Sequence, residues 1–269
     1  MSDDLSLPGP DTGYIATFGA GLPHTLFSHG FAGAIRDTRP FGTGISGTRH
    51  FLHLPGHGGR PSPGPGWTYP QIAESLADAL RATSATQALG VSMSAGGLLY
   101  LLSTAHPVIA DLEKVALVLP ASFTGFPAEV TAANRSYLER LRGLVAGEDV
   151  DGIVDLMLTR EPAEVAEMLP ARAWTKAKAE NLVHTDMSDG LGLALETAVD
   201  DTADAAENLR TFPGEVLILT HEADAAHPVP IAEAIDAAIP NARLEVLPPG
   251  SILWRGRHEV RRILGDFLG

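Results

Sequence analysis

Cysteine is absent from the 269-residue sequence. The chain therefore has no disulfide, no zinc–thiolate site and no thiol nucleophile. It also lacks any apolar run approaching the length of about 18 residues that a membrane-spanning helix needs. The first residues, Met-Ser-Asp-Asp, contain neither the basic stretch nor the apolar stretch of a secretory signal. We therefore expect a cytoplasmic protein.

Basic residues are scarce. The 19 Lys and Arg residues stand against 33 Asp and Glu residues, which gives a formal net charge of −14. A surface this acidic repels phosphate backbones and anionic lipids, so we expect neither nucleic acid nor a membrane as a partner. The apolar fraction of 45% is ordinary for a globular protein and is enough for a packed core.

Seven short apolar runs predict β-strands, and helical patterns fall between them. The runs Val115–Leu119 and Val216–Thr220 do not alternate between apolar and polar residues, which is typical of parallel strands covered on both faces. The sequence therefore predicts an α/β fold with a mostly parallel central sheet flanked by helices. The predicted strands are Tyr14–Phe18, Thr25–Ser28, His50–Leu54, Ala85–Val91, Val115–Leu119, Val216–Thr220 and Leu244–Leu247.

One region breaks this alternation. Between the strands that end near Leu119 and begin at Val216, the sequence contains helical patterns and no convincing strand. We interpret it as an inserted helical cap over residues 123–212, with the core formed by residues 1–122 and 213–269. The helical patterns are Val130–Leu144, Val150–Leu158, Ala163–Leu169 and Ala171–Leu182.

A serine-rich turn follows the fourth predicted strand, where residues 90–96 read Gly-Val-Ser-Met-Ser-Ala-Gly. A nucleophilic serine on a sharp strand-to-helix turn needs small residues two positions before and after it. Two registers satisfy this requirement, one centred on Ser92 and one on Ser94. We favour Ser92, because Gly90 then directly follows a complete strand.

The residues His29-Gly30-Phe31, which follow the second predicted strand, make the sequence resemble the α/β-hydrolase superfamily. The loop from His53 to Gly58 is similar to that superfamily's Asp-x-Pro-Gly-His-Gly loop, with His53 in place of the aspartate. The resemblance implies that His29 and Gly30 shape the pocket. It also implies that the backbone N–H of Phe31 forms one half of an oxyanion hole, the second N–H being that of Met93, or of Ala95 if Ser94 is the nucleophile.

The resemblance also places the catalytic acid after the strand Val216–Thr220, where Asp224 has the expected position and Glu222 is a rival. The superfamily's histidine follows the last strand, but residues 247–252 contain no histidine. Two histidines remain as candidates. His258 follows the acid in the usual chain order but begins the final helix, whereas His227 lies three residues from Asp224.

Together these motifs predict a serine hydrolase acting on a small, largely apolar ester, lactone or thioester. The displaced histidine leaves two alternatives open. One is a non-hydrolytic enzyme, such as a cofactor-free cyclase or lyase of specialised metabolism, and the other is a catalytically inactive ligand-binding protein. The sequence shows no dinucleotide fingerprint and no metal-ligand spacing, so we expect no cofactor and no metal. The expected partner is a small-molecule substrate, and the sequence predicts no oligomeric state.

Overall fold

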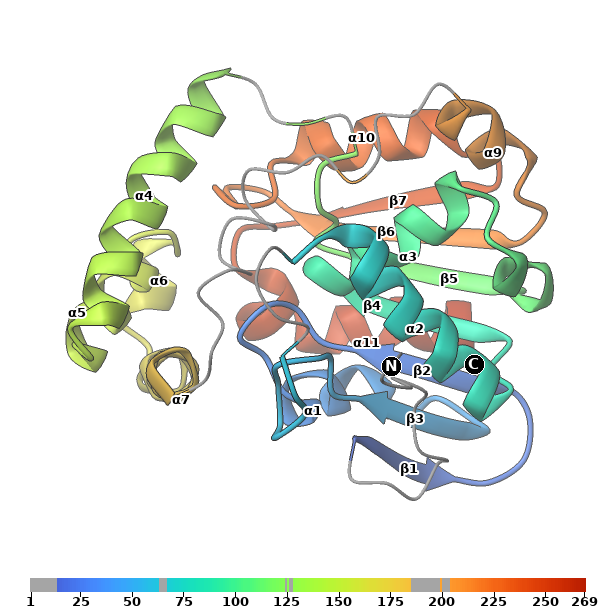
Figure 1. The fold of residues 1–269 in the computed structure, drawn as a ribbon, viewed down its shortest axis with the longest axis horizontal. Coiled ribbons are helices and arrows are strands. Elements are labelled where there is room, and N and C mark those ends of the chain that lie inside the picture. The colour runs from blue at the N-terminus through green and yellow to red at the C-terminus, as the bar shows by residue number, and fades with distance from the viewer. Residues whose placement is uncertain (1–13, 63–66, 124, 126–127, 185–198, 200–203) are drawn as a thin grey trace, which may run out of the picture.

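A seven-stranded sheet forms the centre of the protein (Figure 1). The computed structural model describes residues 14–62, 67–123, 125, 128–184, 199 and 204–269. The strand order is β1-β3-β2-β4-β5-β6-β7, and only the edge strand β1 runs antiparallel to its neighbour. The strands are β1 (Ile15–Gly19), β2 (His24–Ser28), β3 (Thr48–Leu52), β4 (Gln87–Val91), β5 (Lys114–Val118), β6 (Glu215–His221) and β7 (Ala242–Leu247). They confirm the seven predicted strands and the mostly parallel sheet.

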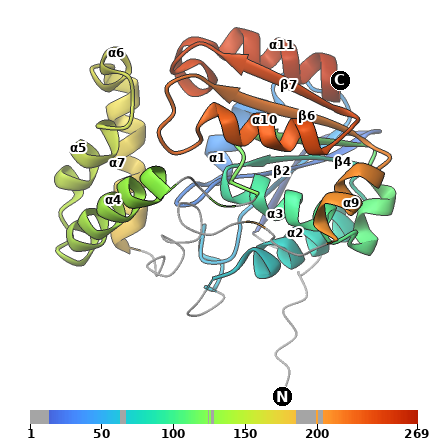
Figure 2. The same cartoon turned by 90° about the horizontal axis from the view of Figure 1, so that it is seen from above.

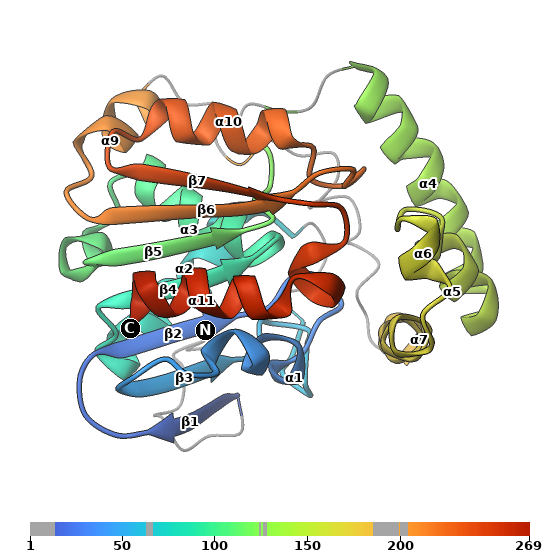
Figure 3. The same cartoon turned by 180° about the vertical axis from the view of Figure 1, so that it is seen from behind.

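Helices cover both faces of this sheet. Helices α2, α3, α9 and α10 lie on one face, and α11 lies on the other (Figures 1, 2 and 3). The short elements α1 and η1 pack on the same face as α11. The helices of the core are α1 (Ile35–Thr38), η1 (Arg39–Gly42), α2 (Tyr69–Thr83), α3 (Met93–Ser103), η2 (Pro107–Asp111), α9 (Ala205–Thr211), α10 (Val229–Ala238), the π-helical turn η4 (Ser251–Arg255) and α11 (Arg257–Leu268).

The non-alternating strands are explained by these two helical layers. Successive side chains of a strand point to opposite faces of the sheet. In β5, Val115 and Leu117 pack toward α2 and α3, whereas Ala116 and Val118 pack toward α11. Both faces are therefore apolar, and burial on both sides replaces the alternation seen in half-exposed strands.

The N-terminus of α2 follows the pattern expected from the sequence. The side-chain oxygen of Gln71 accepts a hydrogen bond from the Thr68 N–H at 2.9 Å, and Pro70 occupies the first turn, where its missing N–H costs nothing. The helix ends at Ser84, whose φ of 51° lies in the left-handed region. After Ser84 the chain enters β4, and β4 leads to the serine-rich turn.

Four helices between β5 and β6 stand apart from the sheet layers, beside the ends of the strands (Figures 1 and 3). They have an apolar cluster of their own, which also includes Ala32 from the core. All four fall inside the range predicted for the cap, whereas α9, at the end of that range, packs Leu209 into the core. We call these four helices the cap. They are α4 (Ala128–Ala146), α5 (Val150–Leu158), α6 (Ala163–Ala166) and α7 (Leu169–His184).

The predicted cap range also covers residues 185–198 and 200–203, which lie outside the described residues. Among the helices that are described, none combines the length and the apolarity that crossing a bilayer would require.

The strand β4 and the helix α3 approach each other closely at Gly90. A Cβ at this position would lie 2.7 Å from the backbone N of Ala95 and from the carbonyl group of Ser94. We expect Gly90→Ala to lower the free energy of unfolding in urea by about 1–3 kcal/mol, because backbone atoms cannot yield to the added methyl group.

Gly143 in the helix α4 provides the matched control. A Cβ there would meet no atom within 4 Å. Gly143→Ala should raise the free energy of unfolding by about 0.5–1 kcal/mol, since alanine loses less backbone entropy in a helix. Equal stability of Gly90→Ala and the unmodified protein would contradict this account of the turn.

Candidate active site

Ser92 lies on the turn between β4 and α3, in a strained backbone conformation. Its φ is 52° and its ψ is −108°, which is an unfavourable combination for a residue with a side chain. The Ser92 N–H donates to the Val118 carbonyl oxygen at 2.9 Å, which ties the turn to β5. Gly30 allows the neighbouring loop to pass close, because a Cβ at Gly30 would lie 3.1 Å from the Ser92 Cβ. This is the geometry of a nucleophile elbow.

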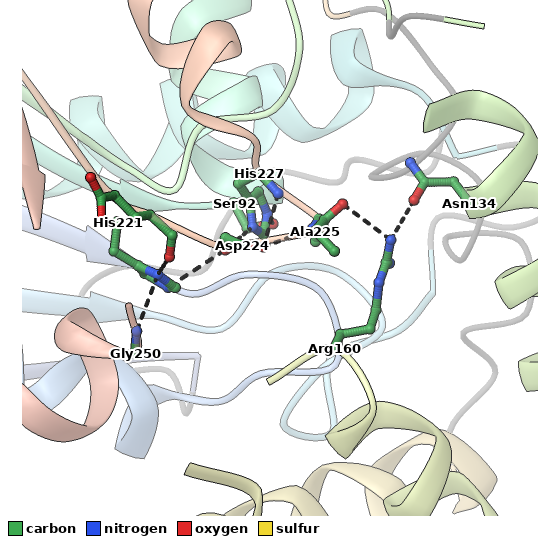
Figure 4. A network of polar contacts seen from close by, with 10 residues as sticks. Ser92, Asn134, Arg160, His221, Asp224, Ala225, His227 and Gly250 are labelled. Carbon is green, nitrogen blue, oxygen red and sulfur yellow. Dashed lines mark hydrogen bonds and ion pairs between the residues drawn. The ribbon is translucent and has the colours of Figure 1, made fainter. Parts of the chain in front are cut away.

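The hydroxyl of Ser92 contacts an imidazole (Figure 4). Ser92 Oγ lies 2.9 Å from His227 Nε2, and His227 Nδ1 lies 2.9 Å from Asp224 Oδ2. With Nδ1 protonated and donating to the carboxylate, Nε2 is free to accept the serine proton. Three of the residues singled out in the sequence therefore form one continuous chain of contacts.

The acid and the imidazole both come from the loop between β6 and α10. Asp224 Oδ1 accepts hydrogen bonds from the N–H groups of Ala226 at 2.7 Å and His227 at 3.0 Å. Burial by itself raises the pKa of Asp224, but the charge and hydrogen bonds of His227, with the charge of His221, outweigh it. They hold the pKa of this carboxyl well below its usual range, so Asp224 stays ionised at neutral pH.

The competing sequence candidates lie elsewhere. Ser94 is fully buried, and its Oγ lies within hydrogen-bonding distance of Ser28 Oγ, at 2.8 Å, and of the His29 carbonyl oxygen. His258 is exposed in the first turn of α11, which covers the face of the sheet opposite to that covered by α3, the helix that follows Ser92. The side chain of Glu222 is also exposed. The structure thus brings Ser92, Asp224 and His227 together, whereas Ser94, Glu222 and His258 lie outside this chain of contacts.

The two predicted oxyanion-hole donors are the backbone N–H groups of Phe31 and Met93, on the two segments that meet at Ser92. Phe31 follows the close-passing Gly30, and Met93 is the first residue of α3, where the helix dipole favours negative charge. Within the described residues, neither N–H has a hydrogen-bond acceptor. Both are therefore free to donate to an oxygen held next to Ser92.

Two buried histidines hold the loop that carries Phe31. His57 Nε2 accepts from the Ala32 N–H at 3.0 Å, and its Nδ1 lies 2.8 Å from the Pro55 carbonyl oxygen. His29 Nε2 accepts from the Leu54 N–H at 3.2 Å, and its Nδ1 lies 2.8 Å from the Gly30 carbonyl oxygen. A ring nitrogen can accept only when the imidazole is neutral, so both histidines act as neutral braces.

A cavity of about 240 Å³ lies in front of Ser92, between the core and the cap. The segment after β7, in which the superfamily resemblance places a histidine, contributes Leu253 and Trp254 to its wall. The cap contributes both apolar and charged side chains. They are Tyr137, Leu141, Met157, Arg160, Glu161, Trp174, Lys178 and Leu182.

Sequence reasoning missed the residues around the acid. His221, at the end of β6, places Nε2 3.7 Å from Asp224 Oδ2 (Figure 4). Arg160, from the cap, donates through Nη2 to the Ala225 carbonyl oxygen at 3.2 Å and to Asn134 Oδ1 at 2.5 Å. His221 sits directly after a predicted strand, a signal that was available. Nothing in the sequence of the cap indicates that Arg160 reaches the acid loop.

Among the described residues, no group of three His, Asp or Glu side chains is arranged to hold a metal ion. The polar groups of the site are instead arranged around one serine hydroxyl. A strained serine, an imidazole, an ionised carboxylate and two free N–H groups are the parts that acyl transfer requires.

The fold and this site define an α/β hydrolase with a helical cap. The family model described as alpha/beta hydrolase family matches residues 19–260. The chain belongs to the alpha/beta hydrolase family, which confirms the resemblance seen in the sequence. No curated protein matches the sequence significantly.

Solved structures with the same fold have low sequence identity to this chain. A bromoperoxidase from Bacillus anthracis has a TM-score of 0.74 at 17% identity, covering 95% of this chain and 94% of that one. An enol-lactonase from Burkholderia xenovorans has a TM-score of 0.72 at 18% identity over 95% of each chain. An esterase from Thermogutta terrifontis has a TM-score of 0.70 at 18% identity, over 95% of this chain and 93% of that one. At such identities the likeness shows the fold alone.

The neutral brace formed by His57 predicts a pH dependence of stability. Burial lowers the pKa of His57 from 6.5 to about 4. Between these two values the unfolded chain binds a proton that the folded chain does not, so stability falls as the pH falls. We expect His57 to account for a loss of about 2 kcal/mol in the free energy of unfolding between pH 7 and pH 5.

Urea unfolding of the unmodified protein and of His57→Gln at both pH values measures this contribution. The variant should be less stable at pH 7, but its loss between pH 7 and pH 5 should be smaller by about 2 kcal/mol. The same pH-dependent loss in both proteins would show that His57 is not held neutral.

Proposed function

We propose that this protein is a serine hydrolase that acts on a small, largely apolar ester, lactone or thioester. The observation that carries the proposal is the chain of contacts from Ser92 Oγ through the His227 imidazole to the Asp224 carboxylate, each 2.9 Å long. The mostly apolar wall of the cavity in front of Ser92 supports a substrate of modest size and polarity.

The geometry supplies each step of acyl transfer. His227 Nε2 takes the proton of Ser92 Oγ as that oxygen attacks the carbonyl carbon, and Asp224 stabilises the imidazolium that forms. The N–H groups of Phe31 and Met93 donate to the oxyanion. His227 then returns the proton to the leaving oxygen or sulfur. A water molecule, deprotonated by the same imidazole, releases the acyl group from Ser92.

The alternatives raised by the sequence depended on a missing base. In the proposed mechanism His227 is that base, and its contact with Ser92 supports this assignment, so the absence of a histidine in residues 247–252 no longer favours a cyclase, a lyase or an inactive binding protein. The fold neighbours named as an esterase and an enol-lactonase also support acyl transfer as the class of reaction.

Covalent labelling with a fluorophosphonate tests the nucleophile, because this reagent reacts with an activated serine. We expect one label per chain by intact mass. Ser92→Ala should abolish labelling and lower the turnover of short-chain esters on the order of 10⁴-fold or more, whereas Ser94→Ala should still be labelled. Labelling that survives in Ser92→Ala and disappears in Ser94→Ala would refute the assignment, and no labelling of the folded protein would refute the proposed function.

The two histidine candidates are distinguished by a matched pair of variants. His227→Ala removes the base and should lower kcat for the same esters on the order of 10³-fold or more. His258→Ala removes an exposed imidazole on the far face of the sheet and should leave kcat unchanged. Circular dichroism of both variants controls for folding. A large loss of kcat in His258→Ala with normal folding would overturn the proposed triad.

A further inference from the structure

Lys178 projects a positive charge into the cavity that contains Ser92. It belongs to the cap helix α7 and lines the same cavity as Ser92 and His227. Its ammonium group lies over the Trp174 ring, 4.4 Å from the ring centroid. Within the described part of the chain it has neither a hydrogen bond nor an ion pair. Arg160, the other cation of the cavity wall, is by contrast hydrogen-bonded to Asn134 and Ala225.

A cation in this setting is unfavourable without a counter-charge. Burial lowers the pKa of Lys178, while the carboxylates of Asp37 and Glu161 act in the opposite direction. An ammonium group that has lost water gains most from a partner that both accepts its hydrogen bonds and balances its charge. The face of an aromatic ring supplies only part of that stabilisation.

Of the three carboxylates that line the cavity, Asp224 is bonded to His227, and the two that act on Lys178, Asp37 and Glu161, do not fill this role. Asp37 is already bonded at both oxygens, since Oδ1 accepts from the Trp174 Nε1–H at 2.9 Å and Oδ2 accepts from the Ala34 N–H at 2.8 Å. Burial, followed by the charge of Asp224, raises the pKa of Glu161, which makes its charged form less favourable. Neither carboxylate lies within the ion-pair distance of 4.0 Å from Lys178.

A hydrogen bond between the cap and the core holds the helix that carries Lys178. The Trp174–Asp37 hydrogen bond joins α7 to α1, the helix that follows the loop carrying Phe31. The charge of Lys178 also contributes to lowering the pKa values of His29 and His57, the two braces of that loop. The ammonium group is therefore close enough to that loop for its charge to act on both braces.

We propose that Lys178 binds a carboxylate of the substrate, so that the substrate is a small ester, lactone or thioester that carries a second, anionic carboxylate group away from the bond to be broken. This inference rests on the proposed function for the reaction, but it concerns a separate group of the substrate. The carboxylate takes the place of water at the ammonium group and leaves the acyl carbon next to Ser92.

Matched substrates test the subsite. The monomethyl esters of C5 to C8 dicarboxylic acids carry a carboxylate at the far end, and the methyl esters of monocarboxylic acids of equal length do not. Lys178→Met keeps an unbranched side chain of nearly the same length and removes its charge. We expect it to raise the ratio of KM for the charged ester to KM for the neutral ester by about 10-fold or more, the range of a charged hydrogen bond.

Two control variants test whether the effect depends on the charge and on the position of the lysine. Lys178→Arg retains the charge and should keep most of the preference for the charged ester. Lys176→Met removes an exposed lysine two residues earlier on the same helix, which lies outside the cavity, and should change neither KM. If Lys178→Met changes both KM values by the same factor, the lysine has a structural role, such as pairing with Glu161, and the proposal is wrong.

Binding measurements separate this proposal from the proposed function. On Ser92→Ala, calorimetric titration with monomethyl adipate needs no turnover. Tighter binding of this half-ester than of methyl hexanoate, lost when Lys178→Met is added, supports the subsite even if no ester is hydrolysed. Equal affinity for the two ligands, or no binding of the half-ester, would overturn the subsite and leave the serine hydrolase proposal standing on its own tests.

Discussion

The carboxylate of Asp224 is the group on which the rest of the site depends. One of its oxygens accepts two backbone N–H groups and so fixes the loop after β6, and the other faces the imidazole of His227. A buried charge needs hydrogen bonds to be stable, and this loop supplies three of them locally. The same bonds that stabilise the carboxylate therefore aim the imidazole at Ser92.

The cap and the core meet around this site through polar contacts. Arg160 ties the cap to the carbonyl group of Ala225, and Trp174 ties it to Asp37 on the other side of the cavity. Between these anchors the cap contributes apolar side chains and the ammonium group of Lys178. In the proposed function, the core supplies the parts for acyl transfer, and the cap supplies the surface that would distinguish one substrate from another.

The features that sequence reasoning predicted correctly are those set by neighbouring residues. The apolar runs mark the strands, and Gly90 and Gly96 mark the serine turn, because each depends on local packing and backbone geometry. The choice between His227 and His258 was beyond the sequence, since it depends on which loop brings an imidazole to the serine across the sheet edge. Lys178 was missed for the same reason: the cavity that it lines forms where the cap docks on the core, and the Trp174–Asp37 hydrogen bond of that contact joins residues that are 137 positions apart in the chain.

Asp224 and His227, the proposed acid and base, lie three residues apart on one loop. The segment after β7 therefore supplies no group to the proposed proton transfer. In this segment the Gly250 N–H contacts His221, beside the acid, whereas Leu253 and Trp254 line the cavity without taking part in proton transfer. Leu253 and Trp254 can therefore change to reshape the pocket without disturbing the reacting groups. An edge of the site that would otherwise be fixed by catalysis becomes a place where natural variation or directed evolution can alter which molecules enter.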